Sequence, residues 1–115
     1  MNDAVHRIAE ARADTVRLVE SLSRQWDAIV EASTLTTNDD EHDPEGATVA
    51  FERAQVQDML RQARVDLTDL DTADQRLRAG TYLVCERCGG PIAEDRLAAR
   101  PAARTCIVCA NKVRR

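Results

Sequence analysis

Four cysteines form two pairs near the C-terminal end of this 115-residue chain. Cys85 and Cys88 make one C-x-x-C pair, and Cys106 and Cys109 make a second, with seventeen residues between Cys88 and Cys106. Each pair lets two thiolates reach one metal ion from a single tight turn, and this spacing is typical of four-cysteine zinc sites. Four thiolates complete a tetrahedron and leave no position for a reactive water. The pattern therefore predicts one structural Zn2+ ion rather than a catalytic one.

A redox-active disulfide is the main alternative for such cysteines. It would normally use one C-x-x-C pair inside a thioredoxin-like βαβ unit, which this sequence does not show. His6 and His42 are remote in sequence from the cysteines and are not needed as ligands. The chain contains no evident nucleophile–base pair and no open metal position, so we do not expect an enzyme.

Two long helices are predicted ahead of the cysteines. Residues 3–33 and 47–79 contain no Pro or Gly, and apolar residues recur in both at three- and four-residue steps, interrupted by Arg12, Arg53 and Asp74. Two helices of about 30 residues joined by about a dozen favour an antiparallel hairpin packed along its apolar stripes. A dimer or bundle sealed by the same stripes remains the alternative. We predict an all-α fold, in which a long antiparallel helical hairpin (a coiled coil) precedes a small C-terminal four-cysteine zinc finger.

Composition divides the chain in the same way. We place the coiled-coil arm at residues 1–79, with an acidic tip at 34–47, and the zinc-finger module with its basic tail at 80–115. Up to Ala79 there are 17 acidic and 9 basic residues, whereas from Gly80 onward there are 7 basic and 3 acidic residues. An acidic body argues against a protein that wraps duplex DNA. We therefore expect docking onto another protein and no direct sequence-specific DNA binding.

Hydropathy gives no sign of a membrane or secretory segment. No apolar stretch approaches the roughly 20 residues that a spanning helix needs, and the N-terminal residues lack a signal-peptide core. We expect a cytoplasmic protein with no membrane partner, in which cysteines bind metal more readily than they form disulfides.

The finger sequence then points to a known family. The stretch "GTYLVCERCGGPIAEDRLAARPAARTCIVC", with an acidic turn and "FERAQ" ahead of it, resembles the DksA/TraR-type C4 zinc finger proteins. The resemblance is close over residues 38–110 and extends to the first helix only by architecture. It implies a bacterial transcription regulator that binds core RNA polymerase directly. Such a protein inserts its coiled-coil arm into the secondary channel and brings its acidic tip near the active site, where it modulates initiation.

The resemblance also assigns residues to that tip. Well-known members carry an Asp-x-x-Asp-x-Ala pattern, which no register of this chain reproduces whole. Anchoring on "FER" matches His42, Glu45 and Ala47, and another register uses Asp40 and Asp43. We expect the tip to lie where the family places it and to have an altered regulatory effect. By composition alone, these acids would be a hydrated turn.

Effector binding is a further point of difference. Members that share a ppGpp site with polymerase place basic residues on the second helix and after the last cysteine, where this chain has Asp69 and Ala110. Arg100 is kept, and we take Arg96 and Arg100 as candidate polymerase or effector contacts. Because an anionic Asp69 would repel a polyphosphate, we do not expect ppGpp to bind in that manner.

Two other functions stay open at this stage. One is a helical dimer or scaffold that uses the zinc finger as a protein-docking module. The other is a nucleic-acid-docking finger that uses its arginines and the terminal "KVRR". The finger has few aromatic residues for base stacking, which argues against the second. An arm that enters a channel must be free, so the regulator hypothesis predicts a monomer.

Overall fold

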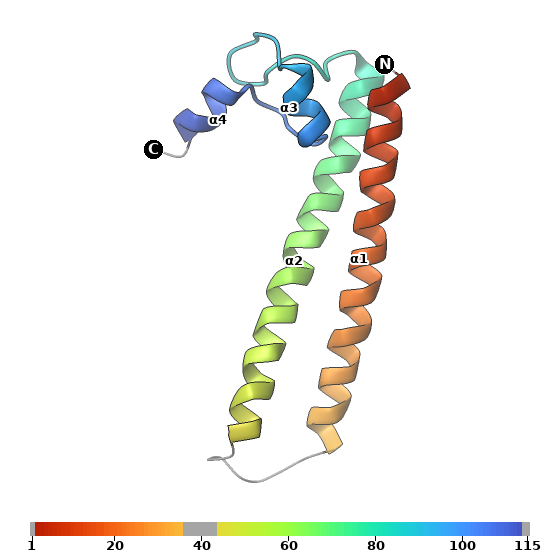
Figure 1. Cartoon of the computed structure of the whole chain (residues 1–115), viewed down its shortest axis with the longest axis vertical. Helices are drawn as coiled ribbons and strands as arrows, with labels where there is room; N and C mark the ends of the chain where they lie inside the picture. The colour runs from red at the N-terminus through yellow and green to blue at the C-terminus, as the bar shows by residue number, and fades with distance from the viewer. Residues whose placement is uncertain (1, 36–43, 114–115) are drawn as a thin grey trace. The chain divides into compact units, whose positions relative to one another are not determined.

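The described part of the chain is helical. The computed structural model describes residues 2–35 and 44–113, with side chains described for residues 3–32 and 46–112. It contains α1 (Asn2–Leu35), α2 (Pro44–Ala79), α3 (Glu94–Ala99) and α4 (Ile107–Val113) (Figure 1). Within these ranges the β pairing is limited to an isolated bridge between Val84 and Pro91. The predicted all-α class is confirmed. None of the helices so described combines the length and apolarity needed to cross a membrane.

The two long helices extend beyond their predicted bounds. The sequence predicts a second helix from residue 47, but α2 begins at Pro44 and includes Gly46. Proline breaks a helix when it lies inside one. At the first helical position its missing N–H is not needed and its fixed φ favours the helix. α1 likewise extends from Asn2 to Leu35, beyond the predicted range of 3–33.

The chain forms two compact units, each containing parts of α1 and α2. The first unit comprises Met1–Asp14 and Asp66–Arg115, and the second comprises Thr15–Val65. In the first, the start of α1 packs against the end of α2. In the second, the later part of α1 packs against the earlier part of α2 (Figure 1). Both pairings are antiparallel, as the predicted helical hairpin requires.

The second unit is held together by the predicted apolar seam. Leu22 of α1 is only 2% exposed and packs with three buried residues of α2, namely Val56, Leu60 and Ala63. Three half-buried residues of α1 pack against this cluster: Val19, Trp26 and Ile29. Arg53, a polar interruption in the stripe, places its guanidinium 5.5 Å from the centroid of the Trp26 ring. This cation–π contact explains how a charged residue is accommodated beside the seam.

The first unit buries residues of both helices against the finger. Ala4 and Ile8 of α1 and Ala73 of α2 pack with buried finger residues, namely Tyr82, Cys85, Ile92, Leu97, Ala103 and Cys109. The helical spacing of apolar residues in 3–33 begins at Val5 and predicts that Val5 is buried, but Val5 is 50% exposed and its neighbour Ala4 is buried. Near its start, α1 meets the finger as well as α2, and this shifts the buried face by one residue.

The remaining seam interruptions also have partners. Arg12 of α1 pairs with Asp71 of α2 at 2.7 Å, and this hydrogen bond raises the pKa of Arg12. Asp74 pairs with Arg78 one turn along α2 at 3.1 Å. Both pairs are exposed to solvent, so each adds little stability.

The seam of the second unit can be tested with two leucines of α1. Leu22→Ala should lower the free energy of unfolding by about 2 to 5 kcal/mol, because it leaves a cavity among packed side chains. Leu18→Ala makes the same chemical change at a side chain that is 45% exposed, and it should cost less than about 1 kcal/mol. Chemical denaturation of the zinc-bound protein measures both. Equal losses would show that the seam does not stabilise this unit.

Candidate metal centre

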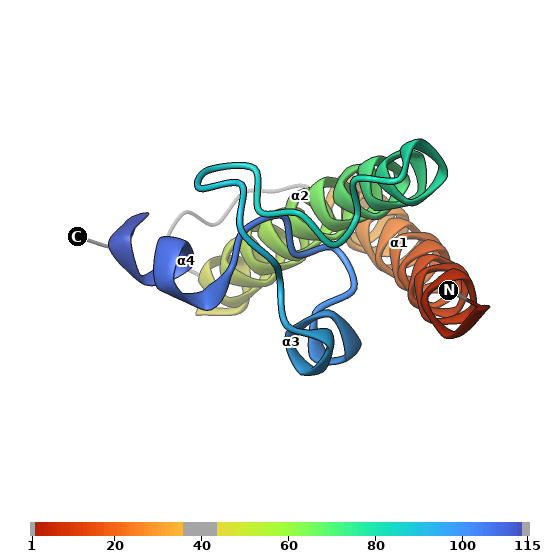
Figure 2. The ribbon, with the colours of Figure 1, turned by 90° about the horizontal axis from the view of Figure 1, so that it is seen from above.

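A glycine turn directs the chain from α2 into the finger. Gly80 follows the last residue of α2 with a φ of +82°, a left-handed conformation that favours glycine. Its N–H donates to the Leu77 carbonyl at 3.2 Å, and the Thr81 N–H donates to the Arg76 carbonyl at 2.9 Å. These bonds satisfy carbonyls at the helix end, as is typical of a glycine that follows a helix C-terminus. Figure 2 shows the loop leaving this end of α2 and leading to α3 and α4.

The first C-x-x-C pair sits on a tight turn. The Cys85 N–H donates to the Gly90 carbonyl at 2.8 Å, and the Gly89 N–H donates to the Cys85 carbonyl at 2.9 Å. Gly89 has a φ of +76°, so a side chain at this position would be strained. The Gly90 N–H donates a hydrogen bond to the Cys88 sulfur, with 3.4 Å between the nitrogen and the sulfur. The turn therefore brings both thiols toward one point.

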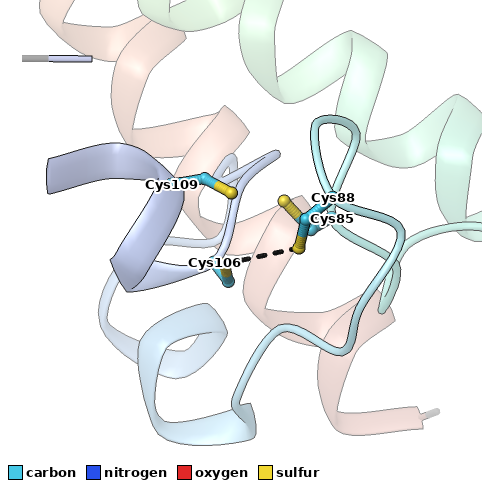
Figure 3. A group of neighbouring side chains, drawn as sticks. All are labelled: Cys85, Cys88, Cys106 and Cys109. Carbon is cyan, nitrogen blue, oxygen red and sulfur yellow. Dashed lines mark hydrogen bonds between the residues drawn. The ribbon is translucent and has the colours of Figure 1, made fainter. Parts of the chain in front are cut away.

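The second pair lies at the start of α4. Cys106 directly precedes the helix and Cys109 lies within it, and the Ala110 N–H donates to the Cys106 carbonyl at 2.9 Å. A backbone bond of 2.9 Å from the Glu86 N–H to the Arg104 carbonyl joins the two halves of the finger. The thiols from both pairs face one another in Figure 3, and all four sulfur atoms lie within 4.8 Å of each other.

This arrangement fits a zinc ion. Zn–S bonds of about 2.3 Å in a tetrahedron imply sulfur–sulfur separations of about 3.8 Å. The Cys88 and Cys106 sulfur atoms are 3.8 Å apart. Cys85, Cys88, Cys106 and Cys109 are therefore suited to hold one zinc ion, which confirms the predicted cofactor. A bound zinc would link two segments of the finger and leave no coordination position for substrate.

The pKa values of Cys85, Cys106 and Cys109 are shifted in different directions. Backbone N–H groups, that of Cys88 foremost, lower the pKa of Cys85 to about 6, although burial acts in the opposite direction. The N–H of Cys109 likewise lowers the pKa of Cys106. The hydrogen bond between the Cys109 and Cys106 side chains raises the pKa of Cys109 to about 12. Near neutral pH the group holds at least one thiolate ready for a metal and at least one proton that a metal must displace.

Of the other predicted site residues, the structure describes the side chains of Arg96, Arg100 and Ala47. Arg96 is half-buried in α3 and donates through Nε to the Thr105 carbonyl at 2.8 Å, whereas Arg100, just after α3, is exposed. Ala47 is exposed near the start of α2. Glu45 belongs to α2, and its side chain is outside the described residues. Asp40, His42 and Asp43 also lie outside the described residues.

Charged contacts of the finger were not anticipated from the sequence. Arg104 lies 3.4 Å from Asp69 of α2 and 4.0 Å from Glu86 of the first cysteine turn. Arg76 of α2 donates to backbone carbonyls of the finger. In sequence Arg76 reads as a solvent-facing helix residue, and no local signal marks its partners.

Comparison with known proteins bears on the finger directly. Residues 80–115 match the family described as the prokaryotic dksA/traR C4-type zinc finger. This segment therefore resembles a DksA/TraR-type zinc finger. An uncharacterized protein of Aquifex aeolicus (strain VF5) is 47% identical over 49 residues, which cover 43% of this chain and 34% of that protein. The chain thus aligns with about a third of the length of that relative.

A solved structure resembles nearly the whole chain. The structure of transcription factor DksA2 from Pseudomonas aeruginosa matches with a TM-score of 0.56 and 24% sequence identity, covering 95% of this chain and 84% of that one. At this identity the likeness concerns the fold. The two chains therefore share a helical fold over most of their length.

Zinc affinity should rise with pH. Zinc binds thiolates, so binding must release the proton held at Cys109 at neutral pH, and it releases further protons once Cys85 is protonated below about pH 6. Lowering the pH therefore weakens binding, more steeply below this value. Competition with a chromophoric zinc chelator across this range measures the slope, with the chelator's own protonation corrected. A pH-independent affinity would contradict the proton assignment.

Proposed function

We propose that this protein is a non-enzymatic bacterial transcription regulator of the DksA/TraR type, which acts in the cytoplasm by binding core RNA polymerase. Its paired helices α1 and α2 form an arm that enters the secondary channel. The acidic tip at residues 34–47 then lies near the active site and modulates initiation. The observation that carries this proposal is a DksA/TraR-type finger joined to a DksA2-like helical fold.

The surface of the finger supports docking onto another protein. Four apolar residues beside the cysteines are exposed: Leu83 and Val84 directly precede Cys85, and Ile107 and Val108 lie between Cys106 and Cys109. Because the four sulfur atoms meet at one point, their sequence neighbours are brought close together as well. Exposed apolar residues on a small finger favour a protein partner, which would cover them on binding.

The arm offers the features that an insertion mechanism needs. Phe51, in the "FERAQ" stretch near the start of α2, is 68% exposed and available to a partner. The neighbouring segment carries the carboxylates assigned to the tip, namely Asp40, Asp43 and Glu45. In a crowded active centre with limited solvent, such charges would act strongly on nearby basic side chains or bound metal.

The environment of Asp69 supports the proposed absence of a family-type ppGpp site. The Asp69 carboxylate lies 3.4 Å from the Arg104 guanidinium, so Asp69 forms an ion pair with an arginine of the finger. A polyphosphate approaching this place would meet a carboxylate and compete for a partly engaged arginine. We therefore propose regulation that does not depend on ppGpp bound at Asp69 and Ala110.

Polymerase binding and the tip can be tested separately. The zinc-loaded protein should co-purify with core RNA polymerase and compete with other secondary-channel factors. Asp43→Ala combined with Glu45→Ala should leave this binding intact and change transcript yield from a responsive promoter, because only the tip charge is removed. If the variant binds polymerase and gives the same transcript yield as the parent, the tip carboxylates have no regulatory role and form only a hydrated turn.

Oligomeric state provides the control for that experiment. Light scattering should show a monomer, since a paired arm could not enter the channel. A dimer that persists at nanomolar concentration, together with failure to bind polymerase, would favour a helical scaffold instead. Salt-sensitive binding to nucleic acid in the absence of polymerase would favour a nucleic-acid-docking finger.

The effector proposal has its own test. The parent protein should give the same transcription output with and without ppGpp. Asp69→Lys combined with Ala110→Lys restores the basic positions and should introduce a response, because two cations replace a carboxylate and a neutral side chain. Arg104 loses one of its two carboxylate partners in this variant, so zinc content is measured alongside. A ppGpp response in the parent would overturn the proposal.

A further inference from the structure

Two arginines hold the chain immediately before each C-x-x-C pair. Arg76 of α2 donates through Nη2 to the Val84 carbonyl and, at 2.9 Å, to the Thr81 carbonyl. Arg96 of α3 donates through Nε to the Thr105 carbonyl at 2.8 Å. Val84 directly precedes Cys85, and Thr105 directly precedes Cys106. In each C-x-x-C pair, the carbonyl of the residue before the first cysteine thus accepts a hydrogen bond from an arginine, and the two arginines lie on different helices.

Arg76 also reaches the other half of the finger. Its Nη1 lies 3.5 Å from the carbonyl of Ala103, which is three residues before Cys106. One side chain therefore contacts the backbone ahead of both cysteine pairs. Arg76 and Arg96 are both half-buried, and a charged donor gives a stronger hydrogen bond to a carbonyl than a neutral one does.

We propose that Arg76 and Arg96 are positioning residues that set the zinc affinity of the finger. The direction of the Cys85 and Cys106 thiols depends on the backbone just before them. Fixing the Val84 and Thr105 carbonyls restricts that backbone before a metal arrives, so less conformational freedom is lost on binding. Neither arginine contacts the metal; each acts through the peptide that carries a ligand.

Charge supports the same role. Four thiolates around one zinc ion leave an excess of negative charge, which lies in a partly buried place where water compensates it poorly. Arg76 and Arg96 bring positive charge to the peptides that adjoin two of the ligands. Arg96 thus has an internal function in place of the partner contact expected from the sequence.

Zinc affinity of the intact protein tests the proposal. Arg76→Gln and Arg96→Gln should each weaken zinc binding by about 10-fold or more, as loss of a group that orients a metal ligand commonly does. Arg76→Lys keeps the charge without the forked donor, and its affinity should fall between those of parent and Gln variant. Arg78→Gln is the matched control, because Arg78 is on the same helix, has a side chain that is 79% exposed and pairs with Asp74. Its affinity should be unchanged.

Two further readouts separate positioning from a general loss of structure. Cobalt(II) substituted for zinc should give the same tetrahedral thiolate absorption in every variant, since the ligands are untouched. Far-ultraviolet circular dichroism should retain its helical signal. If Arg76→Gln fails to fold, Arg76→Lys and Arg96→Gln decide the question.

Parental zinc affinity in Arg76→Gln and Arg96→Gln would overturn the proposal. An equal loss in Arg78→Gln would overturn it too, because the effect would then be one of overall charge. These measurements use no polymerase, so their outcome is independent of the regulatory function proposed above.

Discussion

The meeting of four thiols is the constraint on which the finger depends. Two of the predicted ligands are also core residues: Cys85 is 1% exposed and Cys109 is 7% exposed, and both pack with Tyr82, Ile92 and Leu97. A segment of this size buries too little apolar surface to fold on that basis alone, and a metal crosslink supplies the missing stabilisation. Zinc binding and packing of the first unit are therefore parts of one process.

The second unit rests on a different physical basis. Its buried residues come from α1 and α2, which pack along a seam of Leu, Val, Ile and Ala side chains with no metal ligand among them. Helices of this length are stabilised mainly by such contacts rather than by intrinsic propensity. Folding of this unit therefore depends on the helical seam.

Two of the finger's arginines have partners within the protein. Arg104 pairs with Asp69 and Glu86, and Arg96 donates to a backbone carbonyl. Charges committed to partners inside the protein are less available to phosphate groups. This favours docking of the finger through its exposed apolar residues and weakens the case for a nucleic-acid-binding surface.

The sequence by itself determined the parts of this protein that are locally encoded. The cysteine spacing identified the metal, because chelation from a tight turn is a short-range property, and apolar periodicity identified both helices and most of the seam. Tertiary structure decided what depends on residues distant in sequence. The burial of Ala4 in place of Val5 follows from the packing of the finger against the start of α1. The partners of Arg76 lie up to 27 residues away, and the Arg104–Asp69 pair joins residues 35 apart. No periodicity records such contacts, since they form only when the glycine turn at Gly80 brings the finger back onto the helix ends.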